Sequence, residues 1–501
     1  MQAHRLDRRR FLGQSGVLAA GCALVALPAH AAFADFDALA YGAKGDGTTN
    51  DASSIQQAID ACSEAGGGRV ILPGNRTYLS GTIELKPYVE LHISGGATLK
   101  TCGDRRTLST LGALIFAKDA PGIAVTGTGT IEGNFTAFFN EMGDGGYKVI
   151  EAFLGPYDPL DPPGTADPAT GRPRMILFLN CRGARLLNFT IHNAPTWTIH
   201  PVGCKDLLVD GITIDNDLLV PNCDGIGIDH CQNVHLANCN ISSGDDCIIV
   251  RASRNFDQYG PCENVTVTNC SLVSSSAAIK VEPEGAQAVR NAVFSNCVIN
   301  RSNRGICVSN RDGSLIENVL FSNLVIGTEL RARMWWGAGE PVFVTNQLRN
   351  NQMKVGPIRH VRFQNLVCRG ENGIFLYGGS DSPVQDIAFS NVQLTIEKSS
   401  RIEGGFYDLR PGDLNPGVYQ HKLAGVYSEN IDGLQLEEVS VNWGANSPAY
   451  YGPALVANHV SGLRRQSFRG LSAHPGKEPD ILIDGKPVGE DILKRPPRDL
   501  K

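Results

Sequence analysis

The sequence predicts an all-β protein, a right-handed parallel β-helix with long loops that form a cleft. The first observation is a series of strand-like stretches from about residue 180 onward, each alternating apolar and polar residues. The second is their period, since one shared slot recurs at intervals between 23 residues (188 to 211) and 42 residues (323 to 365). The third is the asparagine that fills this slot in all but one repeat. Such a period predicts a solenoid.

The repeat units are short stretches rich in β-branched residues. An alternation of period 2 buries one face of a strand, whereas a helix needs period 3.6, so the units are expected to be strands. A β-propeller is the alternative, but its blades need about 40 residues and four strands each, which most of the intervals cannot hold. The units are ARLLNFTI (184–191), LLVDGITI (207–214), VHLANCNI (234–241), VTVTNCSL (265–272), AVFSNCVI (292–299), VLFSNLVI (319–326), VRFQNLVC (361–368) and IAFSNVQL (387–394).

The repeated slot also predicts how the turns are built. Coils stacked about 4.8 Å apart place equivalent positions above one another, so the slot asparagines should form a hydrogen-bonded ladder. Cysteines that directly follow an asparagine are expected to stack inward, because free cysteine is among the most buried residue types. The asparagines are Asn238, Asn269, Asn296 and Asn323, and the cysteines are Cys181, Cys239, Cys270 and Cys297.

The chain of 501 residues divides into three expected parts. Residues 1–31 resemble a twin-arginine export signal, with basic residues at 8–10, an apolar run over 17–27 and a small-x-small cleavage site at 29–31. Residues 32–470 are expected to form the β-helix, and residues 471–501 a C-terminal tail. We therefore expect a periplasmic or secreted protein. Lipid attachment at Cys22 is the alternative for the first segment.

Composition narrows the range of partners. The formal net charge of -6 gives no overall basic field, which argues against nucleic acid. No segment after the signal approaches the ~20 apolar residues of a membrane span. Without Cys22, 13 of the 14 cysteines remain (14 − 1), an odd number that cannot all pair. No cysteine pair has zinc spacing, so we expect no metal site formed by cysteine. We also expect no cofactor and a monomeric protein.

Three aspartates are the candidates for catalysis. Asp245 and Asp246 lie side by side in SSGDDCIIV (242–250), and Asp224 precedes them by 21 residues (245 − 224), about one coil. The three carboxylates should therefore converge. Convergent carboxylates raise one another's pKa, so one can stay protonated as a general acid while the others act as bases. Hydrolysis of a glycosidic bond requires this division. A calcium site or a set of turn aspartates are the alternatives.

The same stretches resemble the polygalacturonases, glycoside hydrolase family 28. Residues Asn222–Asp224 resemble the Asn-Thr-Asp element of that family, and residues Gly244–Cys247 resemble its Gly-Asp-Asp-Cys element. The stretches 41–73 and 193–204 are also similar, and the likeness runs from about residue 36 to 440. The resemblance implies that Asp245 is the general acid. It also implies that Asp224 and Asp246 orient and deprotonate the attacking water, with inversion, and that Asn222 lies beside the substrate.

Two elements of the family are missing. The histidine of the Gly-His-Gly element aligns with about Ala277, and the Arg-Ile-Lys element is replaced by Cys307–Ser309. In ordinary polygalacturonases both elements hold the galacturonate at the cleavage point. Their absence argues against unbranched polygalacturonate as the substrate.

Other side chains are candidates for holding a sugar. Lys280 and Arg304 are placed to bind a sugar carboxylate, with a solvated face as the alternative. Trp335 and Trp336 are expected to stack on sugar rings, with a hydrophobic plug as the alternative. His200 is expected to line the cleft, with a satisfied core residue as the alternative.

The sequence therefore predicts an inverting glycoside hydrolase that acts on an acidic, pectic polysaccharide or its oligomers. One alternative is a β-helix polysaccharide lyase, which abstracts a proton beside a uronate carboxylate with Arg or Lys and calcium. The other is a non-catalytic carbohydrate-binding solenoid whose aspartates cap turns. The product separates the two enzymes, because a lyase leaves an unsaturated sugar that absorbs ultraviolet light.

Overall fold

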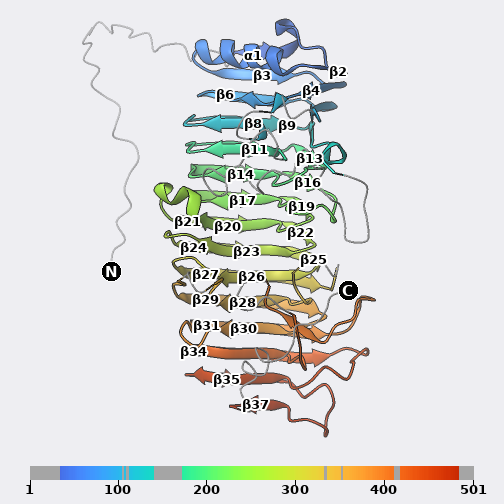
Figure 1. The fold of residues 1–501 in the computed structure, drawn as a ribbon, viewed down its shortest axis with the longest axis vertical. Helices are drawn as coiled ribbons and strands as arrows, with labels where there is room; N and C mark the ends of the chain where they lie inside the picture. The colour runs from blue at the N-terminus through green and yellow to red at the C-terminus, as the bar shows by residue number, and fades with distance from the viewer. Residues whose placement is uncertain are drawn as a thin grey trace, which may run out of the picture.

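The computed structural model describes residues 34–103, 107–108, 112–139, 172–331, 336–350, 354–410 and 418–484. Within these ranges the chain is a right-handed parallel β-helix, and Figure 1 shows its coils stacked along the long axis. The predicted fold is confirmed, and the propeller alternative is excluded. The predicted signal at 1–31, Trp335 and residues 485–501 lie outside the described residues.

Each coil of the first half contributes one strand to each of three parallel stacks. Stack 1 carries the candidate site. Its strands, in order of pairing, are β5 (Ile83–Glu84), β8 (Ala113–Lys118), β11 (Arg174–Leu179), β14 (Ile199–Val202), β17 (Ile226–Asp229), β20 (Ile248–Ser253), β23 (Ala277–Glu284), β26 (Arg304–Asn310), β28 (Val342–Asn346), β30 (Ile374–Gly378), β34 (Val426–Trp443), β35 (Leu455–Ser461) and β37 (Ile481–Ile483).

Stack 2 holds the predicted repeat strands, and stack 3 follows it in each coil. Stack 2 is β1 (Asp35–Asp37), β3 (Gly68–Leu72), β6 (Val89–Ile93), β9 (Ala124–Gly127), β12 (Arg185–Leu187), β15 (Lys205–Asp210), β18 (Gln232–Ala237), β21 (Cys262–Thr268), β24 (Val289–Ser295), β27 (Ile316–Thr328), β29 (Ile358–Gly370), β31 (Val384–Ile396), β34 and β36 (Arg464–Gln466). Stack 3 is β2 (Asp46–Asn50), β4 (Arg76–Ser80), β7 (Ala97–Thr101), β10 (Thr130–Glu132), β13 (Thr190–His192), β16 (Thr213–Asp215), β19 (Asn240–Ser243), β22 (Ser271–Ser274) and β25 (Val298–Ser302), which pairs with β27.

The core is a set of columns of side chains inside the coils. Residues along each strand alternate between inward and outward, as in β24, so every coil adds the same few apolar side chains to the columns. One column is a stack of phenylalanine rings with centroids 4.9, 5.1 and 4.5 Å apart. Offset ring pairs of this kind contribute about 0.5–1.5 kcal/mol each beyond their buried area. The rings belong to Phe294, Phe321, Phe363 and Phe389.

The predicted asparagine ladder is present, with one interruption. Side-chain amides donate from Asn269 to Asn238 and from Asn323 to Asn296, but Asn296 donates to Thr268 instead of Asn269. The ladder continues through 365 and 391. All of these asparagines have positive φ, a conformation that asparagine tolerates better than most residues. Asparagine therefore recurs at this slot because it suits both the backbone turn and the hydrogen bonds between successive coils.

A second ladder was not predicted. It runs five positions before the first one, again with positive φ at every step. Its amides donate from one coil to the coil before it at 3.1, 3.3 and 3.1 Å. The members are Asn233, Asn264, Asn291 and Asn318, and their shared offset of five from the first ladder (238 − 233) is visible in the sequence.

Both ends of the described coil differ from its middle. Helix α1 (Ala52–Glu64) covers the N-terminal end with a face formed by Ile55, Ala58, Ile59 and Cys62. Short 3-10 helices are η1 (Ala38–Tyr41), η3 (Phe135–Ala137) and η5 (Arg254–Tyr259). At the other end β37 pairs with β35, so parallel pairing continues past the expected domain boundary at residue 470.

Two further observations bear on the sequence predictions. The cysteines of the described residues are free thiols and are buried, including those at 181, 239, 270 and 297 that were expected to point inward. Among the described residues, no helix has the length and apolarity needed to cross a bilayer.

Candidate active site

The three predicted acids lie in two neighbouring turns between stack 3 and stack 1. Asp224 lies in the turn from β16 to β17, and Asp245 and Asp246 lie in the turn from β19 to β20. The Asp245 N–H donates to the Cys223 carbonyl at 3.4 Å, and the Gly225 N–H donates to the Asp246 carbonyl at 2.9 Å. The two turns therefore stack directly, which brings the carboxyl groups to one corner of the coil.

Glycines allow this close stacking. A Cβ on Gly225 would lie 2.4 Å from the Cys247 carbonyl oxygen, and a Cβ on Gly244 would lie 2.2 Å from the Val220 carbonyl oxygen. Both distances are far below van der Waals contact. The glycine beside each acidic element is thus required by the approach of the next backbone segment.

The surroundings of the carboxyl groups change their proton affinities. Burial, followed by the charges of Asp245 and Asp246, raises the pKa of Asp224 well above its ordinary value. Burial and the charge of Asp246 raise the pKa of Asp245 to about 7, although Lys280 acts in the opposite direction. Near neutral pH, Asp245 is therefore able to hold a proton.

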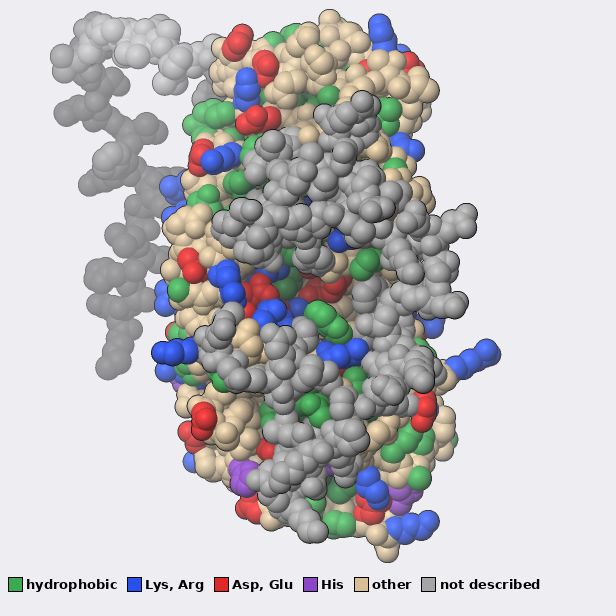
Figure 2. Space-filling model, viewed as in Figure 1, with side chains coloured by type: hydrophobic (Ala, Val, Ile, Leu, Met, Phe, Trp, Pro, Cys, Tyr) green, Lys and Arg blue, Asp and Glu red, His purple; other side chains and the backbone are tan. Residues whose placement is uncertain are grey.

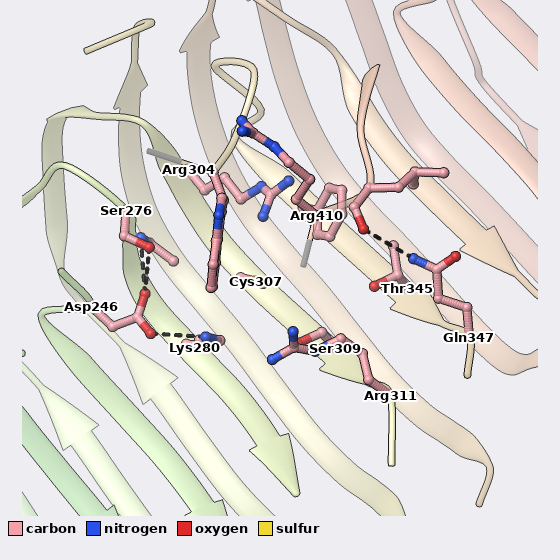
Figure 3. A pocket seen from close by; sticks show the side chains of 14 residues that line it. Asp246, Ser276, Lys280, Arg304, Cys307, Ser309, Arg311, Thr345, Gln347 and Arg410 are labelled. Atoms are coloured by element: carbon pink, nitrogen blue, oxygen red, sulfur yellow. Dashed lines mark hydrogen bonds and ion pairs between the residues drawn. The ribbon is translucent and has the colours of Figure 1, made fainter. Parts of the chain in front are cut away.

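Asp246 has a different environment. It is 2% exposed, and its Oδ1 accepts hydrogen bonds from the Ser276 hydroxyl at 2.9 Å and the Ala277 N–H at 3.1 Å. Its Oδ2 lies 3.0 Å from Lys280 Nζ, as Figure 3 shows. Asp246 is thus held by three donors, which are a hydroxyl, a backbone N–H and an ammonium. The corner combines this tightly held carboxyl group with two carboxyl groups whose pKa values are raised.

A small pocket, open to one side, lies beside Asp246. Figure 2 shows acidic and basic side chains gathered at mid-height of the face turned to the viewer. Four cationic side chains and two aromatic rings are part of the lining, so the pocket suits a ligand that has a negative charge and an apolar ring face. These side chains are Lys280, Arg304, Arg311, Arg410, Trp336 and Phe343.

A hairpin closes the pocket toward the later coils. Its antiparallel strands are β32 (Phe406–Asp408) and β33 (Val418–Gln420), and the Tyr407 ring packs 4.6 Å from Phe375 on the outward face of β30. The neighbouring outward ring of Tyr427 is also buried. Leu409, which follows β32, lines the pocket itself. The open part of stack 1 therefore ends near β28.

Asp408 fixes this wall. It is fully buried, and its carboxylate accepts hydrogen bonds from the Gly337 N–H at 2.7 Å and from the Arg410 guanidinium at 2.8 and 3.0 Å. Its backbone carbonyl accepts a hydrogen bond from Arg304 Nη2 at 2.6 Å. Asp408 thereby joins the hairpin, the loop beside Trp336 and stack 1.

Arg304 lines the pocket but also has partners in the wall. Its Nε lies 3.4 Å from Glu340 Oε2, and its guanidinium lies 3.7 Å from the centroid of the Phe343 ring. Much of its charge is thus used inside the protein. A direct contact between Arg304 and substrate stays a prediction.

His200 does not lie where a substrate contact requires. It is fully buried, its Nδ1 accepts a hydrogen bond from Arg174 at 3.1 Å, and its Nε2 lies 3.3 Å from Asp229. The expected place for His200 in the cleft lining is therefore corrected to a buried place on a covered outward face of stack 1. The imidazole forms polar contacts with the buried side chains of Arg174 and Asp229. This is the alternative stated from the sequence, a buried histidine whose hydrogen bonds are made inside the protein.

The remaining predicted residues have mixed positions. Trp336 is 42% exposed and lines the pocket, whereas Trp335 lies outside the described residues. Asn222 is partly buried with positive φ, and its side-chain oxygen accepts a hydrogen bond from Arg172 at 3.2 Å. For Asn222 and Trp336 the role in binding stays a prediction.

Sequence reasoning missed Glu282 and Ser276. Ser276 donates to Asp246, and Glu282 lies 3.0 Å from Lys280. The signal for Glu282 was present, because it follows Lys280 by two positions on β23 and alternate residues share one face of a strand.

The fold and this corner define a class of protein, a parallel β-helix with an acidic centre in a cationic pocket. Residues 160–404 match the model for glycosyl hydrolases family 28, so the chain is similar to this family over that range. Relatives by sequence include a probable polygalacturonase of Vitis vinifera, 26% identical over 265 residues, which are 48% of this chain and 49% of the relative. A polygalacturonase of Ralstonia nicotianae is 28% identical over 251 residues, 40% and 46% of the two chains. The chain spans about half the length of these relatives.

Solved structures share the fold at low sequence identity. An exopolygalacturonase of Thermotoga maritima has a TM-score of 0.64 at 22% identity, covering 82% of this chain and 92% of its own. A family 28 exopolygalacturonase of Yersinia enterocolitica has a TM-score of 0.57 at 17% identity, covering 88% and 79%. A surface adhesin of Streptococcus pneumoniae reaches 0.54 at 14% identity, covering 86% and 93%. At these identities the likeness shows the fold alone, and an adhesin shares it with enzymes.

Proposed function

We propose that this protein is an inverting glycoside hydrolase that acts on acidic, pectic polysaccharides or their oligomers. The observation that carries the proposal is the acidic corner itself. Asp245, with a pKa of about 7, stands beside Asp246, a carboxylate held by Lys280 and two other donors. One acid that keeps its proton and one carboxylate that keeps its charge are the two groups that inverting hydrolysis needs.

The groups have separate roles in the reaction. Asp245 gives its proton to the glycosidic oxygen as the bond to the anomeric carbon breaks. A water molecule attacks that carbon from the opposite face, and Asp246 takes the proton that the water loses. Asp224, whose pKa is raised by burial and by the charges of the other two acids, orients the water. Deprotonated Asp245 and protonated Asp246 then exchange protons with solvent, which restores the starting state.

Acidic sugars fit the pocket because of its cations. Lys280, Arg304 and Arg311 lie on the same side of the acidic corner and line one space. Ala277 and Cys307 occupy the positions of the missing family elements, and they also line this space. The usual clamp for galacturonate is absent, and one charged hydrogen bond is worth about 1.5–3 kcal/mol. We therefore expect unbranched polygalacturonate to be a poorer substrate than mixed or decorated pectic chains.

The wall argues for cleavage at a chain end. The hairpin β32–β33 covers the outward face of stack 1 beyond β28, and Asp408 ties it to two other segments. A polymer that enters the pocket cannot continue along this face unless the hairpin moves. Cleavage should then release one product size from the start of the reaction, without a ladder of intermediate lengths.

The lyase alternative is less compatible with the cations at this site. Burial favours the neutral amine of Lys280, but the charges of Asp246 and Glu282 outweigh it and raise the pKa of the ammonium. An ammonium that holds its proton so strongly is a poor base for abstracting a sugar proton.

We further propose that residues 1–31 direct export to the periplasm or the medium and that the protein acts as a monomer.

A substrate panel tests the proposal. The purified chain is incubated with polygalacturonate, rhamnogalacturonan and reduced oligogalacturonides, and new reducing ends and ultraviolet absorbance are measured together. We expect reducing ends without absorbance, with the higher kcat/KM on rhamnogalacturonan or on oligomers. Absorbance that rises with the reducing ends would indicate a lyase. No cleavage of any acidic glycan would indicate a binding protein.

A further inference from the structure

Lys280 stands between two carboxylates. Its Nζ lies 3.0 Å from Asp246 Oδ2 and 3.0 Å from Glu282 Oε2, and its side chain is 13% exposed. An ammonium has three N–H donors. Within the described residues these two acids engage two of them, so the orientation of Lys280 is set by the protein before any sugar arrives.

Glu282 is itself fixed from the other side. Its Oε1 accepts hydrogen bonds from the Ser309 hydroxyl at 3.0 Å and from Arg311 Nε at 2.6 Å, and it also pairs with Arg311 Nη2. Both carboxylate oxygens are thus in use in a site that is 2% exposed. A carboxylate held at both oxygens can keep an ammonium at a defined point.

The charges that face Lys280 and Asp246 come from several elements. Burial has the largest single effect on the pKa of Lys280 and lowers it, and the charges of Asp246, Glu282 and Arg311 and the nearby Cys307 follow in that order. The charged groups lie in the two acidic turns and on or beside stack 1. Anions and cations alternate along the chain of contacts from Asp246 through Lys280 and Glu282 to Arg311. They are Asp224 and Asp245 in the turns, Arg251 on β20, Lys280 and Glu282 on β23, Arg304 and Cys307 on β26, and Arg311 just after β26.

We infer that Lys280, held in place by Glu282, is a positioning residue that keeps Asp246 in its charged form as the base. This inference rests on the proposed function, and it differs from a clamp on the substrate carboxylate. As a clamp, Lys280 would affect KM alone. As a positioning residue, it sets the pH range in which the acidic corner works.

The two roles give different pH–rate profiles. Loss of the cation in Lys280→Met removes a charge that favours ionisation of the neighbouring acids, so both limbs of the profile should move to higher pH. An opposite charge at this distance shifts a carboxyl group by about 1–3 units, so we expect a displacement of at least about one unit, with kcat reduced about tenfold or more at pH 6. Lys280→Arg should restore the wild-type limbs.

Glu282→Gln should act in the opposite direction. It removes a negative charge and leaves Lys280 and Arg311 facing the acidic corner, so both limbs should move to lower pH. The control is Arg359→Met, which breaks a part-buried ion pair with Glu317 on stack 2. This control should lower stability slightly and leave the limbs unchanged. If Lys280→Met does not fold, as judged by loss of its melting transition, the test depends on Glu282→Gln, which keeps the size of the side chain. In that variant the limbs of the pH–rate profile should move to lower pH.

A measurement on the free protein separates this inference from the proposed function. Infrared titration of the protonated-carboxyl band, with Asp245→Asn as the reference, reports the acidic corner without turnover. We expect the band to persist to higher pH in Lys280→Met and to disappear at lower pH in Glu282→Gln. The inference would be overturned by identical titrations of the wild type, Lys280→Met and Glu282→Gln. It would also be overturned if the limbs of the pH–rate profile stayed fixed in Lys280→Met while its KM rose. Inactivity of the wild type on every acidic glycan would instead refute the proposed function.

Discussion

At the scale of single residues, neighbouring carboxyl groups of one corner behave differently because their partners differ. Asp246 accepts from a hydroxyl, a backbone N–H and an ammonium, whereas Asp245 is affected chiefly by burial and by the charge of Asp246. Side-by-side acids on one turn therefore need not share one role. The partners of Asp246 come from the coil that follows it, so the proton distribution depends on correct stacking.

The first prediction concerns Asp245→Asn. Loss of the general acid should reduce kcat about 10²- to 10⁴-fold, with KM little changed. The exposed Asp215→Asn, one coil earlier, is the matched control and should keep wild-type kcat. Steady-state kinetics on the best substrate of the panel measures both. Full activity in Asp245→Asn would remove this residue from the mechanism.

The same variant should be more stable than the wild type. The pKa of Asp245 is raised on folding, so the folded state binds its proton more tightly than the unfolded state. Wild-type stability therefore falls as pH rises from about 4 toward about 7. Replacement by Asn removes this loss, so the gain in Tm should be larger at pH 8 than at pH 5. A loss of Tm at both pH values would indicate a structural role.

The pH dependence of turnover follows from the same group. Asp245 must be protonated to act, and its pKa is about 7. The rate should therefore fall as pH rises through about 7, and this alkaline limb should be absent from the residual rate of Asp245→Asn. A kcat/KM profile between pH 4 and 9 measures it, because kcat/KM reports the pKa values of the free protein. A rate that stays flat to pH 9 in the wild type would assign the acid to another residue.

At the scale of elements, the turns of the coil depend on asparagine for backbone and side chain together. Asn365 has φ 53° and lies in the ladder, donating to Asn323 and accepting from Asn391, both at 2.9 Å. Asn365→Gly keeps the turn and loses the hydrogen bonds, at a cost of about 0.5–1.5 kcal/mol. Asn365→Ala also strains the backbone and should cost about 1 kcal/mol more. Urea unfolding compares them, and equal costs would show that the positive φ is unimportant.

The wall gives the second prediction at this scale. Asp408→Asn weakens the hydrogen bond that joins the hairpin to Gly337 and the pair with Arg410 inside the hairpin. We expect a lower Tm and more internal cleavage, seen as a faster fall of viscosity for each new reducing end. Asp386→Asn, which weakens a part-buried pair with Arg362 away from the wall, is the control. An unchanged viscosity ratio in Asp408→Asn, despite a looser hairpin by proteolysis, would contradict closure of the cleft by this wall.

At the scale of the whole molecule, periodicity in the sequence predicts the β-helical scaffold better than the loops and insertions that pack on it. The slot asparagines recur in all but one of the repeats after residue 180, and the strands alternate in each of them, so the β-helix and the stacked turns could be derived from spacing. The convergence of Asp224 with Asp245 followed from the same spacing. Glu282 could have been derived from strand alternation, but Asp408 could not, because it lies in an insertion whose docking on stack 1 has no periodic signal. His200 was misplaced because periodicity does not show which outward faces are covered.

The central claim is that the acidic corner hydrolyses a glycosidic bond with inversion. The most direct test is a ¹H NMR time course of the first product formed from an α-linked uronide substrate by the full chain. We expect the β-anomer to appear first and the α-anomer to grow only by slow mutarotation, because water attacks opposite the bond that Asp245 protonates. An α-anomer as the first product, or an unsaturated sugar, would contradict the claim.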